Sequence, residues 1–277
     1  MPRFKKVYLE ITNVCDLHCA FCPGTERAPC FMTEPEFSAL LARLHGRTDY
    51  LYFHLMGEPL LHPALDRFLS LAGESGFRVC LTTNGTRLPA RCALLCGEPA
   101  LHRVNISLQS WEANPARTPL GDYVRGCADA ARALAAAGKL VSLRLWNVGG
   151  AEARNGEILE LLHGAFPDPW RSGRRGTALA ERLFLERGEK FDWPRPDAGE
   201  TGADFCYGLR DQLGVLCDGT VVPCCLDAAG ALALGNLLET PLETILNSPR
   251  AVAIYDGFSR RRPAEDLCRR CGYAARF

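Results

Sequence analysis

The chain has 277 residues, 47% of them hydrophobic, and its 32 basic and 32 acidic residues give a formal net charge of zero. This length allows one large domain plus a small one, and the charge balance gives no electrostatic reason to expect nucleic acid or a membrane surface as a partner. With no apolar run of membrane-helix length and no signal-peptide core, we expect a cytoplasmic protein. Its 14 cysteines are not expected to form a disulfide framework, and those that cluster are expected to bind metal.

Short apolar runs alternate with helical patterns along the first two thirds of the chain. Strands are predicted near residues 7–12, 50–56, 78–83, 103–108 and 140–146, and helices near 33–45, 63–75, 88–97, 122–137 and 151–163. Thr33 with Glu36 predicts a capping box at the start of the first helix. The Pro- and Gly-containing stretch 167–176 is predicted to be a loop, and a sixth strand is predicted within 182–193. This alternation indicates βαβ units around a parallel sheet.

Six such strands with helices outside them predict an α/β fold, a partial (β/α)6 TIM-like barrel, in which chemistry is expected at the carboxyl ends of the strands. Residues 194–202 are rich in Pro, Gly, Asp and Glu, which is typical of a linker. Beyond them the density of cysteines rises. We therefore predict a barrel domain over 1–200 and a small cysteine-rich α+β domain over 201–277.

Three cysteines, Cys15, Cys19 and Cys22, follow the first predicted strand directly. Three thiols on one short loop can hold one metal centre together, but they leave a fourth position open for chemistry. The alternatives are a zinc site or buried thiols. Zinc usually needs a second, matching pair of ligands, and free cysteines often pack as small hydrophobic residues.

The segment Cys15-Asp-Leu-His-Cys19-Ala-Phe21-Cys22 resembles the cluster loop of the radical S-adenosylmethionine (SAM) superfamily, Cys-x3-Cys-x-aromatic-Cys. The resemblance implies that Cys15, Cys19 and Cys22 hold a [4Fe–4S] cluster. It also implies that the open iron is chelated by the amino and carboxylate groups of SAM, and that Phe21 lies near the adenine.

Met56-Gly57-Glu58-Pro59 ends the second predicted strand and resembles the Gly-Gly-Glu motif of that family, with Met56 in place of the first glycine. The resemblance implies that Gly57 and Glu58 hold the SAM amino group. An ammonium needs oxygen acceptors, and glycine permits a close approach to the backbone. The alternative is a glycine turn with a solvated glutamate.

The fourth and fifth strands contribute further candidates. Asn105, Ser107 and Gln109 alternate, which predicts that they face the barrel interior. Similar enzymes place a serine here against the SAM carboxylate or ribose, and Ser107 is the candidate. Arg144, on an otherwise apolar strand, is predicted to bind an anion, of which the SAM carboxylate is the natural one. The alternative for Arg144 is an internal salt bridge.

A second set of cysteines begins at Cys206. The spacing from Cys206 through Gly219 to Cys224, with a hairpin turn predicted at Asp218-Gly219, resembles the SPASM extension of radical SAM enzymes. The pair Cys268 and Cys271 ends the pattern, which implies the shortened form called a twitch domain. One auxiliary [4Fe–4S] cluster would then be fully ligated by these residues: Cys206, Cys224, Cys268 and Cys271.

Two alternatives stay open for these C-terminal cysteines. A four-cysteine zinc site could use the same residues, and Cys217 or Cys225 could replace one of the ligands. The remaining cysteines are predicted to be buried packing residues: Cys30, Cys80, Cys92, Cys96 and Cys127. Cys92 and Cys96 lie four apart on one helix, which also permits a metal pair.

The resemblance implies reductive cleavage of SAM to a 5′-deoxyadenosyl radical that removes a hydrogen atom from the substrate. An auxiliary cluster that accepts the remaining electron would favour a net oxidation or a crosslink, and a flavodoxin- or ferredoxin-type protein would supply reducing electrons. The substrate is expected to be a sugar- or aminoglycoside-like alcohol or a ribosomal peptide. About six residues precede the first strand, so no leader-recognition module is expected there. The alternative is a non-catalytic iron–sulfur or zinc protein that carries electrons or serves as a scaffold.

Overall fold

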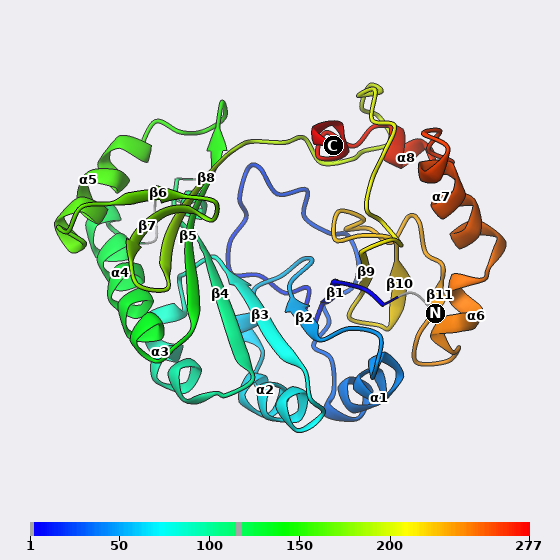
Figure 1. The fold of residues 1–277 in the computed structure, drawn as a ribbon, viewed down its shortest axis with the longest axis horizontal. Helices are drawn as coiled ribbons and strands as arrows, with labels where there is room; N and C mark the ends of the chain where they lie inside the picture. The colour runs from blue at the N-terminus through cyan, green and yellow to red at the C-terminus, as the bar shows by residue number, and fades with distance from the viewer. Residues whose placement is uncertain (1–2, 113, 115–117) are drawn as a thin grey trace.

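The computed structural model describes residues 3–112, 114 and 118–277. Its sheet contains six neighbouring parallel strands, which curve around an interior (Figure 1). They are β1 (Lys6–Leu9), β2 (Tyr50–Phe53), β3 (Arg78–Thr83), β4 (Leu101–Ser107), β5 (Leu140–Val148) and β8 (Leu183–Glu189). The partial (β/α)6 barrel that the sequence predicts is therefore confirmed.

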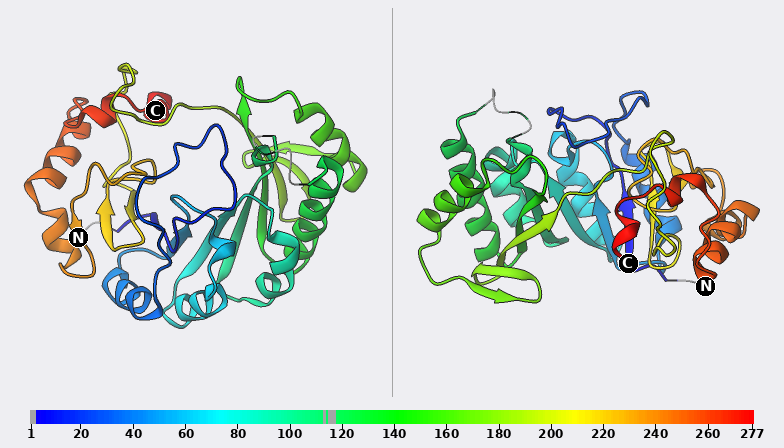
Figure 2. Two further views of the ribbon diagram at one scale, coloured as in Figure 1. Left: turned by 180° about the vertical axis from the view of Figure 1, so that it is seen from behind. Right: turned by 90° about the horizontal axis from the view of Figure 1, so that it is seen from above.

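Helices follow each of the first five strands and cover the outer face of the sheet (Figures 1 and 2). They are α1 (Glu34–Leu44), α2 (Leu65–Glu74), α3 (Leu88–Gly97), α4 (Leu120–Ala136) and α5 (Asn155–Ala165). The capping box at Thr33 and Glu36 is present, so the orphan N–H groups at the start of α1 are satisfied as predicted. Within the described residues, no helix is both long and apolar enough to cross a membrane.

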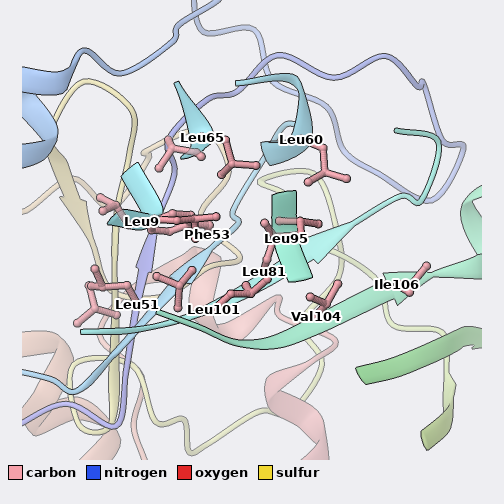
Figure 3. Packing of buried hydrophobic residues seen from close by; sticks show 14 of the residues in the cluster. Leu9, Leu51, Phe53, Leu60, Leu65, Leu81, Leu95, Leu101, Val104 and Ile106 are labelled. Atoms are coloured by element: carbon pink, nitrogen blue, oxygen red, sulfur yellow. The ribbon is translucent and has the colours of Figure 1, made fainter. Parts of the chain in front are cut away.

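The hydrophobic core lies between these helices and the outer face of the sheet. Alternate strand residues such as Leu9, Phe53, Leu81 and Ile106 are fully buried there (Figure 3). Burial of each such side chain contributes about 1.5–3 kcal/mol. Because side chains alternate along a strand, the residues between them point to the concave side of the sheet. Packing on the outside thus fixes which residues line the interior.

The predicted loop at 167–176 contains structure that the sequence analysis missed. β6 (Arg171–Gly173) and β7 (Gly176–Ala180) form an antiparallel hairpin that extends the sheet beyond β8. The short, fully exposed β6 has no buried side to give an alternating pattern. Periodicity could therefore not reveal it.

The C-terminal region continues the same sheet on the other side of β1. β9 (Gln212–Val215) pairs in parallel with β1, followed by β10 (Thr220–Val222) and β11 (Gly235–Asn236), and the hairpin at Asp218-Gly219 is confirmed. Short helices follow: α6 (Leu242–Leu246), α7 (Pro249–Ser259) and α8 (Asp266–Arg269). The domain boundary near residue 200 stays a prediction, and one continuous sheet spans it.

After β8 the chain crosses the side of the barrel that no strand covers and reaches the C-terminal helices (Figure 1). The C-terminal segment packs along this crossing. The amide of Gly272 donates to the carbonyl of Asp192 at 3.2 Å, and the rings of Phe191 and Tyr273 lie 5.2 Å apart. The two segments together hold the C-terminal region against the barrel.

Candidate functional site

The loop that carries the first three cysteines leaves β1 and returns to it. Thr12 and Phe31 form an antiparallel bridge, and the side chain of Asn13 accepts from the amide of Cys30 at 2.8 Å. The side-chain amide of Asn13 also donates to the carbonyl of Ala28 at 2.8 Å. The loop is thus closed at its base, and residues 14–27 project from the carboxyl end of β1.

Cys15, Cys19 and Cys22 lie on this loop without a disulfide between them, and Cys15 and Cys22 are exposed. The amide of Leu17 approaches the Cys15 sulfur at 3.5 Å, and the side-chain amide of Asn114 approaches the Cys19 sulfur at 3.3 Å. Such N–H donors stabilise thiolates and shift the reduction potentials of iron–sulfur centres.

The three thiols hold their protons in the absence of metal. Partial burial raises the pKa of Cys15 to about 11, and it also raises the pKa values of Cys19 and Cys22. Because only thiolates bind metal, formation of a metal centre here must release protons.

Gly57 and Glu58 pack directly against the base of the loop. Gly57 has a φ of +76°, and a Cβ at this position would lie 2.4 Å from the carbonyl oxygen of Thr12. The amide of Glu58 donates to the carbonyl of Val14 at 2.8 Å. Only glycine permits this approach of the end of β2 to the cluster loop.

The carboxylate of Glu58 is 1% exposed and accepts two backbone N–H groups, from Leu60 at 3.0 Å and from Asn84 at 2.7 Å. Burial raises its pKa to about 7, although these hydrogen bonds favour the charged form. The predicted alternative of a solvated glutamate is therefore wrong.

The tip of β3 holds the cluster loop through Asp16, a residue that the sequence analysis did not select. The side chains of Asn84 and Thr86 donate to the Asp16 carboxylate at 2.9 and 2.8 Å, and Arg87 lies 3.5 Å from it. The Asn-Gly sequence at residues 84–85 is by itself typical of a turn. No local signal connected it with a residue of the loop.

Ser107 and Arg144 are register neighbours on β4 and β5 and share one face of the sheet. Arg144 pairs with Glu186 of β8 at 3.1 Å, and the Ser142 hydroxyl donates to the same carboxylate at 2.7 Å. Arg144 therefore makes the internal salt bridge of the alternative prediction. Its contact with SAM stays a prediction, as does that of Ser107. Phe21, 43% exposed, is free to meet a ligand at the loop.

The second predicted set of cysteines converges on a single cavity. Cys206, Cys224, Cys268 and Cys271 all line it, together with apolar residues that include Leu226 and Phe258. The amide of Gly208 approaches the Cys206 sulfur at 3.4 Å. Burial raises the pKa values of the Cys224 and Cys268 thiols, and repulsion from neighbouring thiolates adds to this.

Cys217 and Cys225 lie outside this cavity. Cys217 forms a disulfide with Cys30, with their Cα atoms 6.2 Å apart, so the prediction that Cys30 is a packing thiol was wrong. The two cysteines are 187 residues apart in the chain, and no local pattern could reveal the pair. Cys225 packs with Tyr8 in a small cluster that also contains Leu55.

A single metal ion does not fit the described thiols. A tetrahedral zinc with Zn–S distances of about 2.3 Å needs its sulfur ligands within about 3.8 Å of one another. Over residues 3–112, 114 and 118–277, no three His, Cys, Asp or Glu side chains converge in this way. Three thiols on an open loop and four thiols around a cavity suit a larger, multi-iron group better.

Comparison with protein families agrees with this donor chemistry. The radical SAM superfamily matches residues 9–150, and SPASM, an iron–sulfur cluster-binding domain, matches residues 206–272.

Two relatives are cyclases. A GTP 3′,8-cyclase of Chlorobaculum tepidum is 35% identical over 109 residues, which are 38% of this chain and 32% of the cyclase. A PqqA peptide cyclase of Streptomyces rochei is 25% identical over 299 aligned residues, covering 95% of this chain and 80% of the cyclase. The chain thus spans about a third of the first relative and most of the second.

Solved structures share the fold. BtrN in complex with AdoMet and 2-DOIA has a TM-score of 0.60 at 17% identity, covering 98% of this chain and 94% of BtrN. SuiB of Streptococcus suis bound to S-adenosylmethionine has a TM-score of 0.64 at 14% identity, covering 99% of this chain and 72% of SuiB. The anSMEcpe enzyme with AdoMet and the Cp18Cys peptide also scores 0.64, at 13% identity, covering 99% of this chain and 87% of that one.

The matched domains, the thiols and the fold lead to one assignment. Radical SAM cores bind SAM and a [4Fe–4S] cluster, and SPASM domains bind auxiliary iron–sulfur clusters. The chain belongs to the radical SAM superfamily and carries a SPASM-type iron–sulfur domain.

Proposed function

We propose that this radical SAM protein is an enzyme that removes a hydrogen atom from its substrate and completes a net oxidation or a crosslink. When bound, SAM and its [4Fe–4S] cluster supply a 5′-deoxyadenosyl radical as the hydrogen acceptor. The observation that carries the proposal is the three-thiol loop packed against Gly57 and Glu58 at the carboxyl ends of β1 and β2.

Each of the neighbouring residues has a proposed task at this site. Cys15, Cys19 and Cys22 supply three thiolates and leave one coordination position for the amino acid end of SAM. The absence of a side chain at Gly57 would let the SAM amino group approach the backbone, and the Glu58 carboxylate would accept an N–H of that amino group.

Phe21 of the cluster loop and residues of β4 and β5 make the remaining contacts with SAM in this proposal. Phe21 packs near the adenine, and Ser107 meets the SAM carboxylate or ribose. Arg144 contributes positive charge near the SAM carboxylate. For the carboxylate to bind Arg144 directly, the pair between Arg144 and Glu186 would have to open or be shared.

The cavity of the C-terminal region holds one auxiliary cluster in this proposal. Cys206, Cys224, Cys268 and Cys271 would ligate it fully, which suits electron transfer better than substrate binding. Neither Cys217 nor Cys225 is needed as a ligand. A flavodoxin- or ferredoxin-type protein is the proposed source of reducing electrons, and the cytoplasm is the proposed location.

Both predicted substrate classes have support among the relatives. A peptide is supported by the PqqA peptide cyclase and by the anSMEcpe structure that contains a peptide. A small molecule is supported by the fold of BtrN, which matches this chain over nearly the whole length of both proteins.

Replacement of a loop cysteine tests the proposed reaction. Cys15→Ala should abolish formation of 5′-deoxyadenosine by the anaerobically reconstituted protein under reducing conditions, because two thiolates do not hold the cluster. Cys92→Ala, on the outer helix α3, is the matched control and should retain wild-type turnover. Formation of 5′-deoxyadenosine by Cys15→Ala would contradict the proposal.

Metal analysis separates the enzyme from the alternative of a non-catalytic protein. Iron and sulfide contents of about two cubane clusters, together with SAM cleavage, support the enzyme. Zinc in place of iron, without SAM cleavage, would support a scaffold.

A further inference from the structure

The concave face of the sheet carries a set of polar side chains that the proposed SAM contacts do not use. Strand register places Arg103 of β4 beside Cys80 of β3, and Asn105 between Thr82 of β3 and Ser142 of β5. Val104 and Ile106, which alternate with them, are buried in the outer core. We call the concave-face residues Arg103 and Asn105 the inner wall.

Arg103 carries a charge that the protein does not neutralise. Its Nε is buried without a hydrogen-bond partner, and it forms no ion pair with any carboxylate of the described residues. An arginine presents five N–H donors in a fixed fork, so a buried unpaired Nε is costly. Most interior arginines are paired, and Arg144 on the next strand illustrates this with Glu186.

The groups around Arg103 do not supply the missing negative charge. Tyr52 and Cys80 lie close enough for its charge to lower their pKa values, yet burial raises both overall, so neither is ionised at neutral pH. The same face also carries Lys6, whose ammonium lies 5.9 Å from the centre of the Tyr52 ring.

Arg144 and Glu186 on this face pair with each other. On the same face, Arg78 of β3 adds a further positive charge beside the Tyr50 hydroxyl. His54 is neutral, because burial, with help from Arg144 and Lys6, lowers its pKa to about 3. The charges of this face therefore sum to a net positive value, before any cofactor is considered.

The amide oxygen of Asn105 extends the pattern toward the carboxyl end of β4. Asn105 donates to the Thr82 hydroxyl at 3.2 Å, but its Oδ1 is buried without a donor. Buried acceptors normally have partners. A ligand with an N–H or O–H group beside an anionic group would satisfy the Asn105 oxygen and Arg103 together.

We propose that the inner wall is the substrate subsite and that it binds a carboxylate of the substrate on Arg103, with an N–H or O–H group of the same molecule on Asn105. The inference rests on the proposed function, and it narrows the substrate to an acidic one. It disfavours amino sugars, because their ammonium groups would meet a net positive wall. The carboxylate can belong to a peptide side chain or to a small acid.

The test measures binding of two carboxylate probes to the reconstituted enzyme by anaerobic calorimetry. The probes are glutamate capped by an N-acetyl group and an α-amide, and glutarate. Capped glutamine, which has the same shape as the first probe without its charge, is the reference. We expect capped glutamate to bind more tightly than capped glutamine, because a hydrogen bond to a charged group is worth about 1.5–3 kcal/mol, roughly tenfold or more in affinity.

Variants assign the effect to the inner wall. Arg103→Gln should lose this preference, Arg103→Lys should keep part of it, and Arg125→Gln should keep it all, since Arg125 is exposed on the outer helix α4. Preference for capped glutamate over glutarate indicates a peptide substrate, and the reverse indicates a small acid. Equal binding of capped glutamate and capped glutamine by the wild type, or an unchanged preference in Arg103→Gln, would overturn the proposal.

A second readout separates this proposal from the proposed function. Formation of 5′-deoxyadenosine by the wild type without added substrate measures the radical chemistry independently of the inner wall. If Cys15→Ala loses this activity, the result supports the radical chemistry and says nothing about the substrate subsite. If Arg103→Gln loses the preference for the carboxylate probe, the result supports the substrate subsite and says nothing about the radical chemistry. If the wild type forms no 5′-deoxyadenosine but Arg103 still confers the preference, the proposed function fails and the anion site stands.

Discussion

Small changes in the surroundings of Glu58 are enough to change its protonation state near neutral pH. It is almost fully buried, and two backbone N–H groups oppose the effect of burial, so that its pKa lies at about 7. In the unfolded chain a glutamate ionises near pH 4.3. The folded protein therefore binds this proton more tightly, and the stability contributed by the protonated form is lost as the pH rises from about 4.3 to about 7.

The N–H groups of a bound SAM amino group would donate to the charged form of Glu58 and lower its pKa. We therefore expect the affinity of the reconstituted enzyme for SAM to rise as the pH increases from about 6 to about 8. Glu58→Gln should weaken SAM binding about tenfold or more at pH 8 and remove this part of the pH dependence. Equilibrium binding at several pH values measures both effects, and a pH profile shared by the variant and the wild type would contradict the assignment.

At the scale of elements, the end of β2 and the cluster loop meet without space for a side chain. The contact depends on Gly57, whose backbone conformation favours glycine and whose missing Cβ leaves room for Thr12. The parallel pairing of β1 with β2 sets this distance. The loop and the Gly57-Glu58 segment therefore act as one unit, and movement of either displaces the other.

Gly57→Ala should destabilise the protein by a few kcal/mol and lower the yield of the loop cluster, since both strain and a steric clash result. Gly46→Ala is the matched control. Gly46 has a similar φ of +73°, but no atom lies within 4 Å of the added Cβ, so about 1 kcal/mol of strain is expected. Chemical denaturation and iron content measure the two effects. Similar losses in both variants would show that the contact with Thr12 is unimportant.

At the scale of the whole molecule, the cluster loop is tied to the C-terminal region from several sides. β9 pairs with β1, and the disulfide joins Cys30 at the base of the loop to Cys217 after β9. Glu10, fully buried, pairs with Arg27 of the loop at 2.7 Å and accepts from the amide of Cys217 at 3.2 Å. The two predicted metal regions are therefore parts of one connected structure.

The disulfide closes a loop of 187 residues, which by chain entropy contributes at most about 5 kcal/mol. A thiol reductant should lower the free energy of unfolding of the cluster-free wild type, measured by denaturant titration. Cys217→Ser should start at the lower value and show no response to the reductant. Cys92→Ser, whose thiol is free, should respond as the wild type does. A reductant response in Cys217→Ser would show that another bond is involved.

Much of the architecture was predictable because its signals are local. The capping residues of α1 and the alternating core residues of β3 and β4 lie within a few positions of one another, and the structure has them where the patterns indicate. The exposed strand β6 has no such pattern and was missed. Asp16 was missed for another reason, because its partners Asn84 and Thr86 lie on a different strand tip.

The sequence by itself determined the barrel, the grouping of three cysteines on one loop and the grouping of the four C-terminal cysteines, because these features follow from the spacing of residues that are close in the chain. Only the tertiary structure decided that Cys30 bonds to Cys217, that Arg144 pairs with Glu186, and that Arg103 has no carboxylate partner among the described residues. These outcomes depend on residues brought together from distant parts of the chain, and the charge that remains on the inner wall appears only when all of its neighbours are in place.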